Sequence, residues 1–275
     1  VPLPNGDTWR PKNFSEEALG DVTLLQALAE SLNMATVRLG MDVGVDRVAD
    51  LLVRLGFDRP VAPYPSLLLG AIEMTPMQVV QVYSSLANDG FRTPLRAVRS
   101  VVNADGEPLQ RFPLEVAQVV DPASAYQLNQ GLVTAMELGT GRSAGLPFTV
   151  AGKTGTSDEF RDSWFAGFSG DRVAAVWVGY DDYRPTTLSG ASGALRIWTG
   201  IMRDVSGTSY APPQPAELEA RWVDYHSGAL VSRNCSSAVS LAVPAATRLS
   251  TSGGCSGGRV GIGERTLRWL NDVFN

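Results

Sequence analysis

The spacing of apolar residues predicts helices in the first half of the chain. From residue 24 to residue 57 they recur every three or four positions, with an interruption around Gly40 to Gly44, which predicts two helices joined by a turn. Thr75-Pro76 and Asp121-Pro122 are helix starts, each with a capping residue followed by proline at the first helical position. The helices that they begin are expected to end near Asn88 and Leu138.

The pattern then changes to the alternation typical of strands. Phe148 to Thr156, Ser163 to Ser169 and Arg172 to Asp181 are predicted strands, and the two-residue turn Gly170-Asp171 joins the last two in a tight hairpin. Helical spacing returns from Gly190 to Val205, so this segment can cover one face of an antiparallel sheet. The fold class is therefore α/β in the broad sense, more narrowly α+β.

The end of the chain has a different composition. Residues 206–215 contain three prolines and are predicted to be a linker between a large domain, residues 1–205, and a small C-terminal extension, residues 216–275. The extension is expected to contain a hairpin at His226-Ser227-Gly228 and a closing helix from Glu264 to Phe274. Sixty residues are few for a self-sufficient core.

Composition and charge exclude several classes of protein. The 275 residues are 44% hydrophobic and 19% charged, which is typical of a globular chain. A net charge of −5 argues against a nucleic-acid partner. No apolar run reaches the 18 residues of a membrane-spanning helix. The chain opens without an initiator Met or a leader pattern, so we expect the natural N-terminus to be missing.

Two cysteines, Cys235 and Cys255, lie in a Ser/Gly-rich stretch. With one histidine in the chain, His226, and no C-x-x-C pair, a zinc or redox site is not indicated. We prefer a single structural disulfide to two free thiols, and a disulfide would place the chain in an oxidising compartment. No metal and no cofactor are expected.

Candidate chemistry is concentrated in Ala151-Gly-Lys-Thr-Gly-Thr156. Lys153 is one of only two lysines, and it lies at the end of an apolar strand among glycines and hydroxyl residues. A phosphate-binding loop would need glycine where Pro147 stands, and a helix rather than a strand after the lysine. Alone, Lys-Thr-Gly would more often be a solvated hairpin. Ser31-Leu32-Asn33, between helical segments, changes this, since Ser-x-Asn and Lys-Thr-Gly accompany a Ser-x-x-Lys nucleophile in serine acyl-transfer enzymes.

The stretches around these motifs resemble the bifunctional class A penicillin-binding proteins, and the cysteine-containing tail resembles their 1b type. The resemblance covers nearly the whole chain and is carried by residues 4–14, 27–37, 69–76, 139–142, 152–156 and 162–167. It implies the penicillin-binding protein/β-lactamase-like transpeptidase fold, an antiparallel sheet flanked by helices. The implied activity is D,D-transpeptidation of peptidoglycan stem peptides, with inhibition by β-lactams.

The resemblance also assigns roles to single residues. Ser31 would relay a proton, Asn33 would donate its amide to the substrate peptide, and Lys153 would supply charge and orient Ser31. Thr154 and Thr156 would bind the terminal carboxylate of the stem peptide, with Gly155 keeping the approach open. The Thr156 N–H would form half of an oxyanion hole.

The nucleophile of this family is not in the sequence. A Ser-x-x-Lys motif needs serine three positions before a lysine, and those positions hold Trp9 and Val150. We therefore expect the nucleophile, its helix and the first strands of the sheet to lie upstream, which would leave this chain inactive alone and its core incomplete. The alternative is a non-catalytic module that binds peptidoglycan or a partner in the same cleft.

The family also implies a cellular setting. The parent protein would be anchored in the inner membrane of a Gram-negative bacterium, with this region in the periplasm. Stem peptides and β-lactams would be its ligands, and a homodimer or a cell-wall synthesis complex its assembly.

Overall fold

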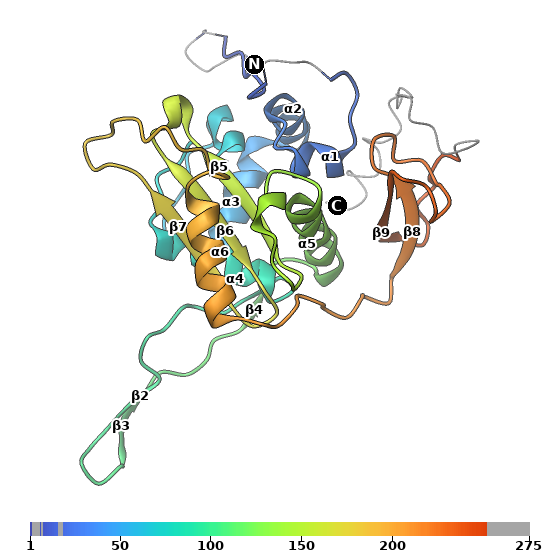
Figure 1. The fold of residues 1–275 in the computed structure, drawn as a ribbon. Helices are drawn as coiled ribbons and strands as arrows, with labels where there is room; N and C mark the ends of the chain where they lie inside the picture. Colours follow the sequence, from blue (N-terminus) through green and yellow to red (C-terminus); the bar gives the residue numbers. More distant parts are fainter. Residues whose placement is uncertain (2–5, 7, 16–18, 252–275) are drawn as a thin grey trace.

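A computed structural model describes residues 1, 6, 8–15 and 19–251. Figure 1 shows a body of helices around one sheet, a projecting hairpin and a small C-terminal sheet. The elements in chain order are α1 (Leu24–Ala29), α2 (Asn33–Val43), α3 (Val45–Arg54), η1 (Pro65–Leu69), α4 (Pro76–Ala87), β1 (Phe91–Arg92), β2 (Ser100–Val102), β3 (Pro108–Arg111), β4 (Ala117–Gln118), α5 (Pro122–Glu137), η2 (Arg142–Ala144), β5 (Ala151–Thr156), η3 (Asp158–Phe160), β6 (Ser163–Phe168), β7 (Val173–Val178), α6 (Ala194–Val205), β8 (Leu218–Asp224) and β9 (Ala238–Pro244).

The central sheet has the antiparallel order β5-β6-β7, as the alternation predicted, and β5 lies at one edge. The strands are shorter than predicted: β5 begins at Ala151 and β7 ends at Val178. Side chains of opposite parity on β6 point to opposite faces. Phe165 packs with Trp198 of α6 on one face, whereas Phe168 packs with residues of α3, α4 and α5 on the other. The sheet therefore lies between two helical layers (Figure 1).

Two helices begin where their caps predicted. Thr75 forms a capping box with Gln78 at the start of α4, and the Asp121 side chain accepts a hydrogen bond from the backbone N–H of Ser124 at the start of α5. Because these capping hydrogen bonds form between neighbouring residues, both helices start at the predicted positions. The start of α6 was predicted four residues too early, because residues 190–193 form a turn.

The prediction of two helices between residues 24 and 57 was wrong. The structure has three, because a break at residues 30–32 separates α1 from α2 in addition to the break at Gly44. Gly40 lies inside α2, where a Cβ would come within 2.3 Å of the Leu68 side chain. Glycine therefore allows η1 to approach α2 there.

A hairpin of β2 and β3, which the sequence analysis did not predict, projects from the body (Figure 1). Every residue in its two strands is exposed. A second short pairing, β1 with β4, lies at the base of this arm. Without a buried face these strands lack the alternation of apolar and polar residues from which strands are predicted.

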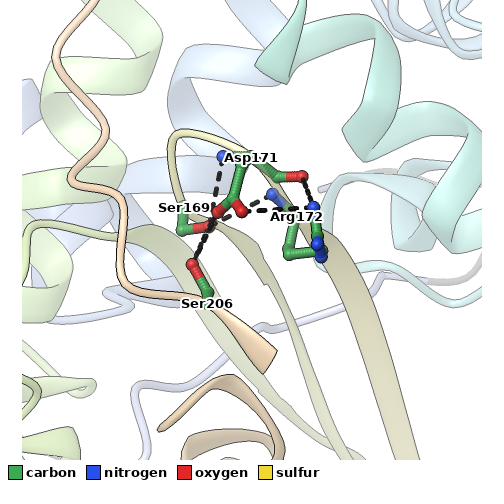
Figure 2. Close-up of polar contacts among 4 residues, drawn as sticks. All are labelled: Ser169, Asp171, Arg172 and Ser206. Carbon is green, nitrogen blue, oxygen red and sulfur yellow. Dashed lines mark hydrogen bonds and ion pairs between the residues drawn. The ribbon is translucent and has the colours of Figure 1, made fainter. Parts of the chain in front are cut away.

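The segment after α6 contains no helix or strand up to β8, but it contacts the body of the protein. Ser206 donates hydrogen bonds to Ser169 (2.8 Å) and to Asp171 (2.6 Å), at the turn between β6 and β7 (Figure 2). The hydrogen bond from Ser206, followed by the one from Ser169 (3.0 Å) and by the charge of Arg172, holds the pKa of Asp171 below its ordinary value. Further along, the Tyr210 hydroxyl accepts a hydrogen bond from Asn129 of α5 at 2.7 Å.

The C-terminal sheet pairs β8 with β9 and lies against α5. The Gln127 side chain donates to the carbonyl of Ala242 (3.0 Å), and the Gln130 side chain accepts from the N–H of the same residue (2.9 Å). The predicted turn at residues 226–228 follows β8. Cys255 and the predicted helix from residue 264 to residue 274 lie outside the described residues, so the disulfide and the domain division stay predictions.

Candidate active site

Ser31 lies in a helix-ending turn that glycine usually occupies. Its φ is 60°, its N–H bonds the carbonyl of Leu28 (3.3 Å), and the N–H of Leu32 bonds the carbonyl of Ala27 (2.9 Å). This hydrogen-bond pair is a Schellman closure, in which the left-handed residue is most often glycine. The left-handed conformation costs a residue with a Cβ about 1–2 kcal/mol. Such strain is typical of functional positions, and here it places a hydroxyl at the end of α1.

The hydroxyl of Ser31 meets Lys153 from the edge strand β5. The Lys153 ammonium donates to Ser31 Oγ at 2.8 Å and to the Thr154 carbonyl at 3.3 Å. Burial lowers the pKa of Lys153 to about 8 from an ordinary value of 10.5. The lysine can therefore lose and regain a proton near neutral pH, and Ser31 is placed to pass that proton on.

Thr154 and Thr156 are the two threonines of β5, and the Lys153 ammonium also lies 3.5 Å from Thr154 Oγ1. Thr154 Oγ1 is 2.7 Å from Thr140 Oγ1, and Thr156 Oγ1 accepts a hydrogen bond from the N–H of Gly190 at 2.9 Å. A Cβ on Gly190 would lie 2.6 Å from the carbonyl oxygen of Gly155, so the glycine at position 190 allows the turn before α6 to cross the strand. The two threonine hydroxyls thus both lie on the edge strand β5, that of Thr154 on a half-buried residue and that of Thr156 on an exposed one.

Thr140 is a site residue that the sequence analysis missed. Its N–H bonds the carbonyl of Ala29 at 3.1 Å, and a Cβ on the preceding Gly139 would come within 2.0 Å of that carbonyl oxygen. The loop after α5 is therefore pressed against the end of α1, next to Ser31. The signal was present in Gly139-Thr-Gly-Arg142, but nothing in that motif showed that Thr140 would face Thr154.

Asn33 is near Ser31, but its amide has a different partner. Asn33 Nδ2 donates to the carbonyl of Lys12 at 2.9 Å, and Asn13 Oδ1 accepts from the N–H of Met34 at 3.1 Å. The segment held in this way continues to Phe14, whose ring meets that of Phe160 edge-on at 5.9 Å, in the turn after β5. The structure thus brings together Ser31, Lys153, Thr154 and Thr156, and it uses Asn33 to hold the segment around Lys12.

Comparison with known proteins identifies the family of this site. Residues 3–196 match the penicillin binding protein transpeptidase domain. The chain belongs to this family. Penicillin-binding protein 1B of Vibrio cholerae is 43% identical over 72% of the chain and 26% of its own length, and that of Escherichia coli is 38% identical over 81% and 27%. The chain spans about a quarter of the length of these relatives, and its resemblance to the 1b type is confirmed.

Solved structures confirm the fold. The crystal structure of penicillin-binding protein 1A from Haemophilus influenzae has a TM-score of 0.80 at 22% identity, over 90% of this chain and 44% of that one. The imipenem acyl-enzyme complex of penicillin-binding protein A from Mycobacterium tuberculosis has a TM-score of 0.60 at 25% identity, over 74% and 52%. Within the part of the chain that the structure describes, no helix is long and apolar enough for a membrane span.

Proposed function

We propose that this chain supplies one wall of a peptidoglycan D,D-transpeptidase site, which cross-links stem peptides by serine acyl transfer. The observation that carries the proposal is the hydrogen bond from Lys153 to Ser31, beside a strand edge that presents Thr154 and Thr156. Because the sequence contains no Ser-x-x-Lys motif, the nucleophilic serine comes from a segment outside these 275 residues.

The first chemical step forms an ester and releases an amine. The serine oxygen attacks the carbonyl carbon of the penultimate D-alanine of a stem peptide, the peptide C–N bond breaks, and D-alanine leaves. The serine loses a proton and the leaving nitrogen gains one. Ser31 and Lys153 relay that proton, as the pKa of about 8 for Lys153 allows. An acceptor amine from a second stem peptide then attacks the ester carbonyl carbon, the new peptide C–N bond forms as the ester C–O bond breaks, and the proton lost by the amine returns to the serine oxygen.

The edge of β5 binds the donor peptide. An extended peptide can pair with a free strand edge through its backbone, which sets register without deep pockets. The Thr154 and Thr156 hydroxyls bond the terminal carboxylate, and the Thr156 N–H donates to the developing oxyanion. Loss of one such donor typically lowers the rate about 10²- to 10³-fold.

β-Lactams are the second class of ligand in this proposal. The imipenem and penicillin G acyl-enzyme complexes of the Mycobacterium tuberculosis protein support it, because the matched region has the same fold. We further propose that the longer protein is anchored in an inner membrane, with this region in the periplasm. A dimer or a cell-wall synthesis complex is its proposed assembly.

Intact mass spectrometry after incubation with penicillin G tests the proposal. It compares this chain with an extended protein, defined as the same reading frame with the upstream segment that carries Ser-x-x-Lys. One penicillin on the extended protein and none on this chain are expected. No adduct on either would favour a non-catalytic binding module, and an adduct on this chain would place the nucleophile within it.

The two lysines provide a matched pair of variants. Lys153→Arg in the extended protein keeps the charge but cannot become neutral, so acylation is expected to fall at least about 10²-fold. Lys12→Arg is the control, because it keeps both the charge and the backbone carbonyl that bonds Asn33, and its acylation rate should match wild type.

A further inference from the structure

Helix α1 is too short to hold its own position. It has six residues, and isolated helices shorter than about 12–15 residues are marginal in water. Its last turn leads into Ser31, so tertiary contacts to α1 decide where the Ser31 hydroxyl lies. One residue of the C-terminal sheet region, Tyr225, contacts both of its ends.

Tyr225 brackets α1 with two polar atoms. The hydroxyl of Thr23, which caps the start of the helix, donates to the Tyr225 carbonyl at 2.8 Å. The Tyr225 hydroxyl donates to Oε1 of Glu30, the residue that ends the helix, at 3.2 Å. Between these bonds the ring packs with Ala29 and Ala135, so Tyr225 is only 8% exposed.

The turn that carries Tyr225 is itself held by hydrogen bonds. Asp224, 4% exposed, accepts hydrogen bonds from the N–H groups of His226 and Ser227 and from the hydroxyls of Ser227 and Ser237, which close the turn around Tyr225. The neighbouring strand β9 is held on α5 through Ala242. Tyr225 therefore projects from a closed turn on an anchored sheet.

Displacement of α1 would move two groups of the site together. Ser31 follows Glu30 directly, and Thr140 is bonded to the carbonyl of Ala29 in the same turn. These two residues meet Lys153 and Thr154 respectively. Misplacement of catalytic groups by about 1 Å can lower a rate 10²-fold, so a small shift of α1 would be costly.

We propose that Tyr225 is a positioning residue of the transpeptidase site, which fixes Ser31 and Thr140 by holding both ends of α1. This inference rests on the proposed function. It gives the C-terminal extension a part in the reaction without contact with substrate. Burial, followed by the adjacent Glu30 carboxylate, raises the pKa of the Tyr225 phenol above its ordinary value, so the hydroxyl remains a donor.

Three substitutions in the extended protein test the inference. Tyr225→Phe removes only the hydroxyl, Glu30→Ala removes its acceptor, and Glu30→Gln restores an acceptor oxygen. The first two are expected to lower the second-order rate of acylation by penicillin about three- to tenfold, through the acylation step rather than through reversible binding. Glu30→Gln should recover most of that loss, and Tyr225→Phe combined with Glu30→Ala should lose no more than either change alone.

Tyr126→Phe is the matched control. Tyr126 packs on the same C-terminal sheet from α5 but does not bond α1, so its loss should leave acylation unchanged. Hydrogen exchange on the extended protein gives a readout independent of acylation. In Tyr225→Phe the amides of Ser31 and Leu32, both bonded within the turn, should exchange faster, while those of β6 should not.

The outcomes separate the two proposals. If the extended wild-type protein takes up no penicillin, the proposed function fails, and hydrogen exchange alone still tests the clamp on α1. If wild type is acylated and Tyr225→Phe is acylated equally fast with unchanged exchange at Ser31, the positioning role is wrong. A rate loss that Glu30→Gln does not recover, or that Tyr126→Phe shares, would also contradict it.

Discussion

Lys153 donates a 2.8 Å hydrogen bond to Ser31 across 122 residues of chain. The surrounding structure holds each of the two residues in a form that is unfavourable for an isolated residue of its type. Ser31 has a left-handed backbone, and Lys153 is an amine buried deeply enough to lower its pKa. Both properties can be measured separately from activity.

The backbone of Ser31 predicts an unusual order of stability. Ser31→Gly and Ser31→Ala both remove the hydroxyl, but only alanine keeps a Cβ at a φ of 60°. We expect the glycine variant to be the more stable by about 1 kcal/mol, the reverse of the order within a helix. Urea denaturation of the two variants measures the difference, and an alanine variant of equal or greater stability would contradict the strained turn.

The amine of Lys153 should titrate near pH 8. Because the chain has two lysines, ¹³Cε-lysine NMR gives two signals, and Lys153→Met assigns them. The folded pKa, about 8, lies below the ordinary 10.5, so between these values the unfolded chain binds more protons. The contribution of Lys153 to the free energy of unfolding therefore rises from about pH 8 to pH 10.5. Lys153→Met should lack this rise; the same rise in both proteins would refute the assignment.

The hydroxyl of Thr140 should matter for acylation rather than for folding. Thr140→Val keeps the shape of the side chain and removes the partner of Thr154 Oγ1. In the extended protein we expect about a tenfold lower acylation rate. Thr134→Val is the control, since the Thr134 hydroxyl bonds only its own helix, at the carbonyl of Gln130. Equal acylation rates for the two variants would show that the Thr140 hydroxyl does not contribute to the site.

Gly139 should tolerate no side chain. A Cβ there would lie 2.0 Å from a backbone oxygen of α1, which cannot move aside as a side chain can. We expect Gly139→Ala to lower the free energy of unfolding by about 3 kcal/mol. Gly200→Ala, in open space on α6, should raise it by about 0.5–1 kcal/mol. Thermal unfolding of both variants checks the contrast, and a stable Gly139→Ala would show that the loop and α1 are not in tight contact.

The elements that were predicted correctly are those determined by residues close together in the sequence. The starts of α4 and α5 follow from Thr75-Pro76 and Asp121-Pro122, and the central sheet follows from alternation and the Gly170-Asp171 turn. The left-handed turn at Ser31 was not predicted, because a serine becomes left-handed only when the end of α1 closes around it. The strands β2 and β3 were missed because neither has a buried face.

The residues of the candidate site also fall into those that local motifs predicted and those that only the structure revealed. Lys153 and Ser31 were predicted together because both lie in recognisable motifs. Thr140 and Tyr225 belong to no motif with an assigned role, and their contacts join segments far apart in the sequence. The predicted role of Asn33 toward substrate remains a prediction, since its amide bonds the carbonyl of Lys12.

The bond between Thr23 and the Tyr225 carbonyl spans 202 residues, and this sets an order of events during synthesis. A ribosome adds about 5–20 residues per second, so α1 is synthesised about 10–40 s before Tyr225. Until then the helix has neither of its end contacts from Tyr225, and the Ser31 turn is free to fluctuate. The part of the site around Ser31 is thus completed late in translation, after the residues that follow β8 have been synthesised.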